Sequence, residues 1–203
     1  EQLGDSGRFG AGLPRRSDSS LLFLQHMISK MKLPAEGGSR LAAIFMGAPL
    51  FAGGIGSGES EIRRWIIEND WLDAVVALPD QVLSTNGNPV FVVLLSNRKP
   101  ESRQGTVQLV DARESFTRLR MSRGRKRNQI ELDQVDAIVR QLREQDRYGS
   151  SRILPNTMFV DPESGHCRIE PWMFLADIDP GTHRPLGELV EFSPNVVLAG
   201  DTP

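Results

Sequence analysis

The sequence is poor in cysteine, in net charge and in long apolar runs. Cys167 is the single cysteine among 203 residues, which excludes an internal disulfide framework and is typical of the reducing cytoplasm. The formal net charge is -2, so any contact with nucleic acid must come from a local cluster of cations. No apolar run reaches the length of a membrane span, and no basic-then-apolar leader opens the chain. We therefore expect a cytoplasmic protein without a membrane partner.

The ends of the chain have little regular pattern. Residues 1–20 are rich in Gly, Ser and Arg, and we expect them to form a loop. The chain does not begin with Met, which indicates a piece of a longer protein. After Arg152, prolines at short intervals favour an irregular tail of turns and extended pieces. Within that tail, residues 158–162 and 166–169 are predicted to pair as a hairpin.

The centre of the chain predicts alternating strands and helices. Three apolar runs have the composition of buried strands, and the first has no alternation, as expected for a strand covered on both faces. These runs are Leu41–Met46, Leu72–Leu78 and Val90–Leu95. A glycine-rich loop, Gly53–Gly58, follows the first run and precedes a helix with Ile62 and Ile66 on its apolar face.

Flanking segments add two helices and one strand. Residues Thr106–Asp111 predict a strand. Apolar residues at helical spacing predict one helix before the centre of the chain and another after it. The first set is Leu21, Leu24, Ile28 and Met31, and the second is Leu132, Val135, Val139 and Leu142.

Several strings along the chain, taken in order, resemble the modification subunits of type I restriction-modification systems, the adenine-specific DNA methyltransferases. They lie at residues 23–28, 50–54, 61–70, 77–79, 87–91 and 105–112. The resemblance is to the second half of that family's catalytic domain. It implies an α/β fold, a partial Rossmann-like (class I methyltransferase) sheet in which Val90–Leu95 inserts as an antiparallel strand. A helix and an irregular Pro-rich tail would follow, and the three apolar runs would be the sheet's last three strands.

The same resemblance implies a division of the chain near residue 150. Residues 1–150 would be the C-terminal part of a methyltransferase catalytic domain, with residues 1–20 as a loop. Residues 151–203 would be a tail or the start of a second segment. Within them, residues 184–190 weakly resemble the entry into the DNA-recognition domains of specificity subunits.

One turn is the candidate target-base pocket. Asn88-Pro89-Val90-Phe91 resembles the Asn-Pro-Pro-Phe/Tyr tetrapeptide with which adenine methyltransferases hold a flipped base. It precedes a strand, however, whereas the catalytic tetrapeptide follows one. We therefore interpret Asn86, Gly87, Asn88 and Pro89 as a turn that lines the target-base pocket, and a plain structural turn is the alternative.

The resemblance also implies which parts are missing. The glycine-rich turn and the acid that hold S-adenosylmethionine have no counterpart upstream of Leu41, and neither does the catalytic tetrapeptide. We therefore assign no catalytic and no cofactor-binding residue. The full-length enzyme would use S-adenosylmethionine, and this fragment would bind no cofactor.

A run of cations follows the predicted strand at residues 106–111. It consists of Arg118, Arg120, Arg123, Arg125, Lys126 and Arg127, with no acid among them. Such a loop can neutralise DNA phosphates, and the alternative is a solvated loop whose charges pair elsewhere. Given the resemblance, we interpret these residues as a DNA or subunit contact.

Two further patterns are candidates for a phosphate-binding loop and for a metal site. Gly53–Gly58 could cradle a phosphate before a helix, but it lacks the Lys-Ser/Thr of a P-loop and more simply forms a surface loop. His166, Cys167 and His183 are too few for a zinc site, so we assign no metal.

These observations favour a fragment of an S-adenosylmethionine-dependent adenine-N6 DNA methyltransferase of a type I system, inactive alone. The alternative is a non-catalytic, methyltransferase-like module that binds DNA or subunits. A nucleotide-binding enzyme built on Gly53–Gly58 is a third hypothesis. The expected partners are DNA and the specificity and restriction subunits of the same system. Because the Leu41–Met46 strand would lack a neighbour, we also expect self-association through its open edge, or pairing with the N-terminal half.

Overall fold

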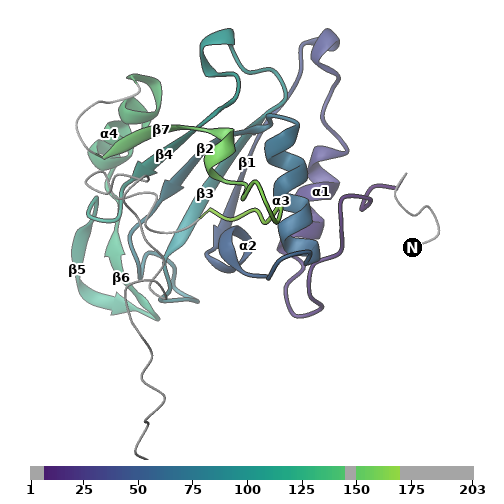
Figure 1. The fold of residues 1–203 in the computed structure, drawn as a ribbon. Helices are drawn as coiled ribbons and strands as arrows, with labels where there is room; N and C mark the ends of the chain where they lie inside the picture. Colours follow the sequence, from purple (N-terminus) through teal and green to yellow (C-terminus); the bar gives the residue numbers. More distant parts are fainter. Residues whose placement is uncertain (1–6, 145–149, 170–203) are drawn as a thin grey trace, which may run out of the picture.

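A five-stranded mixed sheet forms the centre of the protein (Figure 1). The computed structural model describes residues 7–144 and 150–169. The sheet has the order β1-β3-β2-β4-β7, and β5 and β6 form a separate two-stranded ribbon. The strands are β1 (Arg40–Met46), β2 (Leu72–Ala77), β3 (Val90–Ser96), β4 (Thr106–Asp111), β5 (Thr117–Arg123), β6 (Lys126–Gln129) and β7 (Ser151–Pro155). The α-helices are α1 (Ser20–Ile28), α2 (Ala48–Phe51), α3 (Gly58–Glu68) and α4 (Leu132–Glu144), and short 3-10 turns lie at Pro34–Glu36, Glu101–Arg103 and Asn156–Met158.

Strand β3 lies between β1 and β2 and is antiparallel to both. The antiparallel insertion expected for Val90–Leu95 is thus confirmed, and the short connection from β2 to β3 explains it, because a parallel pair needs a longer crossover. The expectation that the three apolar runs are the last strands is wrong. Beyond β2 the sheet continues with β4, which is parallel to β2, and then with antiparallel β7.

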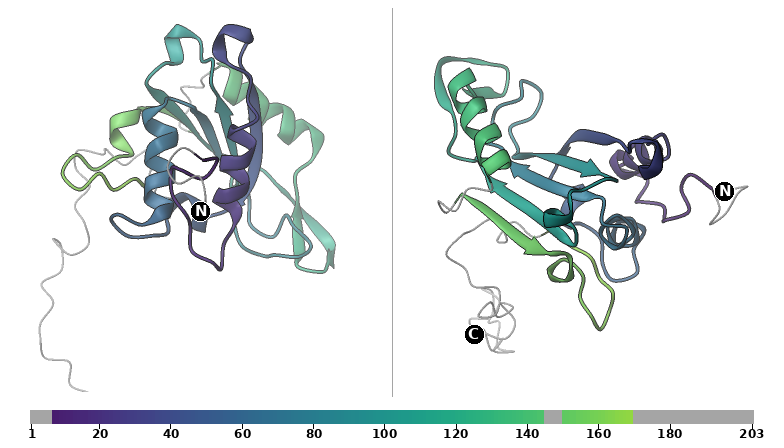
Figure 2. Two further views of the ribbon diagram at one scale, coloured as in Figure 1. Left: turned by 90° about the vertical axis from the view of Figure 1, so that its right-hand side faces the viewer. Right: turned by 90° about the horizontal axis from the view of Figure 1, so that it is seen from above.

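Helices cover the two faces of the sheet unequally (Figure 2). On one face α1 and α3 pack over the larger core, in which Ile62 is fully buried. On the other face α4 packs its Ile138 against Val76 and Val110 in a smaller cluster. Neighbouring residues of β2, such as Val75 and Val76, belong to different clusters because side chains alternate across a strand.

Strand β1 is buried on one face only, contrary to the two-sided burial expected from its unbroken apolar run. Phe45 is buried, whereas Ile44 and Met46 are 61% and 51% exposed. The reason is that α4 packs in the smaller cluster over β2 and β4, and this cluster contains no residue of β1. Among the described residues, β1 pairs with β3 alone, so its other edge is open.

Two other details differ from expectation. The basic segment, expected to be a loop, forms the β5–β6 ribbon, which turns at Gly124 with a positive φ of 62°. The helix predicted after it exists as α4, and Leu142 of its predicted apolar stripe packs against the smaller cluster, but the first half of that stripe does not. Ile138 faces the sheet, while Leu132 and Val135 are 83% and 41% exposed.

The segment after residue 150 packs on the same core in its described part. Val160 pairs with Cys167, which confirms the expected hairpin. The Nε of Arg63 in α3 donates to the Cys167 carbonyl over 2.7 Å, and Cys167 is fully buried. Burial raises the pKa of the Cys167 thiol to about 12, so it stays protonated at neutral pH.

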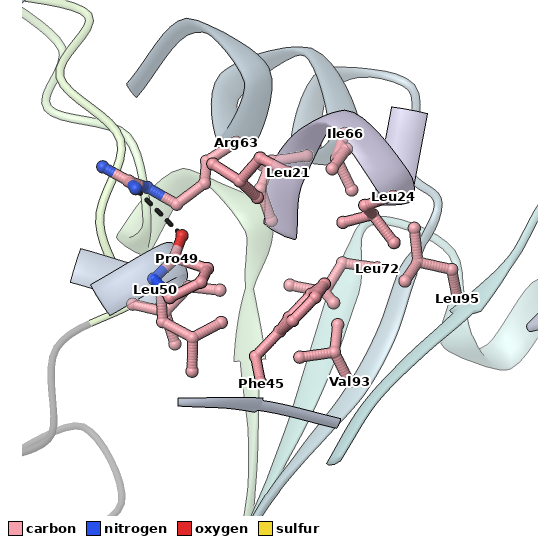
Figure 3. Close-up of a pocket in the computed structure, with 12 residues that line it drawn as sticks. Leu21, Leu24, Phe45, Pro49, Leu50, Arg63, Ile66, Leu72, Val93 and Leu95 are labelled. Carbon is pink, nitrogen blue, oxygen red and sulfur yellow. Dashed lines mark hydrogen bonds between the residues drawn. The ribbon is translucent and has the colours of Figure 1, made fainter. Parts of the chain in front are cut away.

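A small void lies inside the larger core between α1, α3 and the sheet (Figure 3). Its volume is about 20 Å³ and apolar side chains such as Leu24, Phe45 and Val93 line it. At its rim, Arg63 donates a 3.0 Å hydrogen bond to the Pro49 carbonyl. Because a void of this size and lining stays dry or holds one water, it is a packing defect rather than a ligand site.

The first turn of α3 tolerates only glycine at position 58. A Cβ there would fall on the carbonyl oxygen of Leu13, where the N-terminal loop crosses the helix. We expect Gly58→Ala to lower the free energy of unfolding by about 2 kcal/mol, because the crossing backbone must shift. Chemical denaturation measures this. Gly54→Ala is the control, since nothing lies within 4 Å of its Cβ position, and equal stabilities of the two variants would contradict the crossing.

Candidate functional site

The carboxyl ends of β1, β2 and β4 lie at one edge of the sheet, since all three strands run in the same direction. In open α/β sheets this is the edge where ligands bind. A cavity of about 430 Å³ opens there, within the range of small-ligand sites. It is lined by Met46, Gly47, Ala48, Phe51, Ala77, Asn88, Pro89, Phe91 and Arg113.

A second hollow, of about 470 Å³, lies next to the first. It is lined by Gln81, Gly87, Asn88, Arg118, Gly124, Arg125 and Arg127. Asn88 belongs to both linings. The site therefore has an apolar compartment and a cationic compartment, and Asn88 lies where they meet.

The side-chain amide of Asn88 is available to a ligand. Asn88 is exposed, and its backbone N–H donates to Oδ1 of Asn86 over 3.0 Å. Within residues 7–144 and 150–169, however, no hydrogen bond involves its side chain. The amide therefore offers two donor hydrogens and one acceptor oxygen to a molecule that enters either compartment.

The loop between β2 and β3 is held by its own hydrogen bonds. The amide of Asn86 donates to Sδ of Met46 at the end of β1. The backbone N–H of Gln81 donates to the Gly87 carbonyl over 3.2 Å and closes the loop across its base. The buried Asn128 donates to the carbonyl and to Oδ1 of Asp80, both over 3.0 Å. The four residues predicted to line a base pocket are thus held in a defined conformation.

The ribbon is joined to this loop through its backbone. Arg125 N–H donates to the Ser84 carbonyl over 2.9 Å, and Arg127 N–H donates to the Gln81 carbonyl over 2.9 Å. Gly124 approaches so closely that a Cβ would lie 2.7 Å from the Ser84 oxygen. Two sequence segments that we singled out separately therefore form one surface.

The predicted residues do not all lie in the two compartments. Asn88 and Pro89 line the apolar cavity, and Gly87 and Asn88 line the cationic hollow, whereas Asn86 lines neither. Of the six cations, Arg118, Arg125 and Arg127 line the hollow. The other three, Arg120, Arg123 and Lys126, lie elsewhere on the ribbon.

Arg113 is a site residue that the sequence patterns did not indicate. Its Nε and Nη2 donate to the two oxygens of Asp111 over 2.8 and 2.6 Å, a bidentate pair at the end of β4. Burial would raise the pKa of Asp111, but the hydrogen bonds from Arg113 outweigh this and hold it below its ordinary value. The same bonds raise the pKa of Arg113. The pair therefore fixes a charged guanidinium in the cavity wall. The position of Arg113 just after a predicted strand is the sequence feature that could have indicated it.

The remaining candidate patterns line neither compartment. Ser57, inside the glycine-rich loop, caps α3 by accepting from Ser60 N–H over 3.3 Å. Nδ1 of His166 lies 3.0 Å from the hydroxyl of buried Ser60. In the part of the chain that the structure describes, no group of three or more His, Cys, Asp or Glu could hold a metal, and His183 lies outside it.

None of the described helices, over residues 7–144 and 150–169, is both long and apolar enough to cross a bilayer.

The family model N-6 DNA Methylase matches residues 1–155. The HindI methylase subunit of a type I restriction enzyme from Haemophilus influenzae is 31% identical over 114 residues, which is 56% of this chain and 24% of that protein. The MjaVII methylase subunit from Methanocaldococcus jannaschii is 31% identical over 90 residues, or 44% of this chain and 15% of that protein.

Solved structures share the fold at lower identity. A type I restriction-modification methyltransferase subunit from Streptococcus thermophilus has a TM-score of 0.66 at 20% identity, over 82% of this chain and 33% of that one. A modification subunit of a type I restriction enzyme from Vibrio vulnificus has a TM-score of 0.57 at 19% identity, over 84% and 33%. The chain thus spans a quarter or less of these curated relatives and a third of these solved chains.

Proposed function

Because the chain belongs to the N-6 DNA methylase family, we propose that it is the target-DNA side of an S-adenosylmethionine-dependent adenine-N6 methyltransferase of a type I restriction-modification system. The observation that carries this proposal is the position of Asn88 between an apolar cavity and an arginine-lined hollow. A flipped base would occupy the apolar cavity, and the phosphates that flank it would contact the arginine-lined hollow. Alone, the chain is inactive, because the catalytic residues lie in a part of the enzyme upstream of it.

The apolar compartment suits a base that has left the stack. Phe51 and Phe91 contribute aromatic surface, and such side chains replace the former stacking partners of a flipped base. The amide of Asn88 can donate to a ring nitrogen and accept from an exocyclic amine. Asn86, Gly87 and Pro89 hold the loop around it, and this set forms the target-base pocket.

The cationic compartment suits the nucleic-acid backbone. Arg118, Arg125 and Arg127 surround the hollow next to Asn88, and half or more of protein–DNA hydrogen bonds go to phosphate and sugar oxygens. We assign Arg120, Arg123 and Lys126 to the same DNA or subunit contact. Phosphate contacts position the duplex so that one base faces the cavity.

The cofactor site lies outside this chain in our proposal. S-adenosylmethionine supplies the methyl group to the complete enzyme, and its ribose hydroxyls require an acidic side chain. The described residues that line the cavity at the sheet edge include no carboxylate, so they do not fit the ribose of this cofactor. No step of the transfer is therefore assigned to residues of this chain.

The partners follow from the same proposal. Specificity and restriction subunits of the same system would assemble with the complete enzyme in the cytoplasm. The open edge of β1, with exposed Ile44 and Met46 beside it, would pair with a strand of the upstream half or with a second copy. An edge strand with apolar flanks is prone to such pairing. Residues 151–203 would be a tail or the start of a second segment, and of these residues 170–203 lie outside the part that the structure describes. Light scattering of the chain tests self-association.

The alternative is a non-catalytic module of the same fold that docks DNA or subunits. The same cationic hollow favours this alternative, because it can bind DNA without taking part in catalysis. The coding sequence ahead of Glu1 discriminates the two proposals. An intact glycine-rich motif and Asn-Pro-Pro-Phe/Tyr tetrapeptide there support the enzyme, and their absence supports the module.

A calorimetric titration with S-adenosylmethionine tests the placement of the cofactor. We expect no binding to this chain and micromolar binding once the upstream region is restored. Binding to the chain alone would contradict the proposal and make Gly53–Gly58 the leading site.

The target-base pocket is tested with two duplexes, one fully paired and one with the adenine opposite an abasic position. The second should bind more tightly, because an unpaired base costs less to flip. We expect Asn88→Ala to reduce this preference by about 10-fold, the value of one or two hydrogen bonds. Gln104→Ala is the control, an exposed amide in the loop before β4, at the opposite edge of the sheet. Equal preferences in the two variants would remove Asn88 from the pocket.

A further inference from the structure

Met121 on the β5–β6 ribbon is unusually exposed for an apolar side chain, at 82%. It lies in a ribbon whose neighbouring side chains, including Arg120 and Arg123, are exposed cations. A scattered apolar residue on a protein surface needs no explanation. An apolar residue displayed inside a cluster of cations is different, because the cations select what can approach it.

The ribbon displays Met121 through an irregularity in its pairing. Arg118 pairs with Asn128 and Arg123 pairs with Lys126. The β5 residues 119–122 therefore lie opposite a single β6 residue, Arg127. Bulges of this kind bend the longer strand and re-aim its side chains. Met121 lies within this bulge.

Both ends of the bulge are fixed to the proposed target-base loop. At one end, Asn128 is 1% exposed and is bonded to Asp80. At the other end, Arg125 N–H is bonded to the Ser84 carbonyl. The strand opposite the bulge and the turn of the ribbon are thus held against the loop that carries Asn88.

The surroundings determine the kind of occupant. No acid lies between Arg118 and Arg127, so the approaching surface must be anionic. It must also offer an apolar surface to Met121. Duplex DNA offers both, because its phosphates flank grooves whose floor is made of stacked bases. The major groove admits two-stranded ribbons, and apolar side chains including Met insert between base steps in several DNA-bending proteins that bind the minor groove.

We propose that the β5–β6 ribbon enters a groove of duplex DNA beside the target base and that Met121 inserts between two base pairs as an apolar wedge. This inference rests on the proposed function, in which the same ribbon binds DNA through its arginines. It goes further by assigning an unstacking role to one uncharged side chain. The wedge lowers the cost of extruding the neighbouring base toward Asn88.

The test compares two substitutions of similar size in the full chain. We expect Met121→Gln to weaken binding to a DNA duplex by about 10-fold, because a polar side chain cannot replace the apolar surface of methionine. Met121→Leu should stay within about 2-fold of the unchanged protein, since it keeps an apolar side chain of similar volume. Ile55→Ala is the control, because Ile55 is 71% exposed in the glycine-rich loop and lines neither compartment. Fluorescence anisotropy gives the affinities.

A spectroscopic readout separates a wedge from a simple contact. A duplex with 2-aminopurine beside the target adenine brightens when its base unstacks, and we expect Met121→Gln to lose this increase while Met121→Leu keeps it. Equal brightening with glutamine and leucine would overturn the wedge. If Arg125→Glu/Arg127→Glu abolishes binding while Met121→Gln changes nothing, the wedge is wrong and the arginine contact stands. If the chain binds no duplex, or binds single-stranded RNA equally well, both proposals are wrong: the insertion of Met121 and the DNA contact of the arginines on which it depends.

Discussion

Replacing Arg125 and Arg127 together with glutamate is expected to weaken the binding of duplex DNA by about 100-fold at moderate salt. Both side chains are exposed and line the hollow beside Asn88. Each replacement removes a cation that can neutralise a phosphate and adds an anion that repels it. Their backbone N–H groups still bind the Ser84 and Gln81 carbonyls, so the ribbon should keep its place in the variant.

The salt dependence of binding distinguishes a phosphate contact from a loss of structure. The slope of log K against log salt should fall in magnitude by about 2, close to 0.9 for each phosphate that the variant no longer neutralises. The matched control is Arg16→Glu/Arg40→Glu, with the same change of net charge on exposed residues of the loop before α1 and of β1, neither of which lines the hollow. Similar losses of affinity in the two double variants would mean that general charge, and not this hollow, attracts DNA.

Replacing Lys99 with methionine is expected to destabilise the chain by about 3 kcal/mol, near the low end for breaking a buried ion pair. Nζ of Lys99 lies 2.6 Å from Oδ1 of Asp70 and also donates to the Thr106 carbonyl over 2.8 Å. The Lys99 side chain is 1% exposed and that of Asp70 is 29% exposed. Methionine fills a similar volume but leaves the Asp70 charge without its cation.

Asp70 connects three parts of the fold, which is why the loss of stability is large. It also accepts from Gly105 N–H and from the amide of Asn156, both over 3.0 Å. These bonds join the turn after α3 to the loop before β4 and to the end of β7. Urea denaturation measures the loss. The double variant Asp70→Asn/Lys99→Met should recover part of it, because asparagine carries no charge and tolerates the positive φ of 56° at this position.

The pH dependence of stability gives a second measure of this pair. Burial would raise the pKa of Asp70, but the hydrogen bonds from Lys99, Gly105 and Asn156 outweigh it and hold the pKa below its ordinary value. A lowered carboxyl pKa contributes stability above the unfolded-state pKa, and this stability is lost as the pH falls through the folded-state pKa. In Lys99→Met the pKa of Asp70 should rise, so its contribution should vanish at a higher pH. An unchanged acid limb of the stability curve would contradict the assigned pair.

The arrangement of the target-base loop and the basic ribbon illustrates what local patterns can reveal. The sequence placed Asn86–Pro89 in a turn before a strand, and the structure has that turn between β2 and β3. It also indicated a cationic cluster, because charge can be read directly from composition. It did not indicate that Arg125 and Arg127 bond to Ser84 and Gln81, because backbone hydrogen bonds between distant segments leave no trace in residue type.

By itself, the sequence determined strands β1 to β4, helices α1, α3 and α4, and the antiparallel insertion of β3, because apolar periodicity and a short connection constrain them locally. The tertiary structure alone decided which face of each element is covered. Ile44 and Leu132 have the side chains of core residues yet are exposed, and Arg113 became a cavity residue only through the meeting of three strand ends. Burial depends on what packs across a surface, and that neighbour comes from elsewhere in the chain. The physical reason is that periodicity encodes which residues share a face, but not whether that face finds a partner.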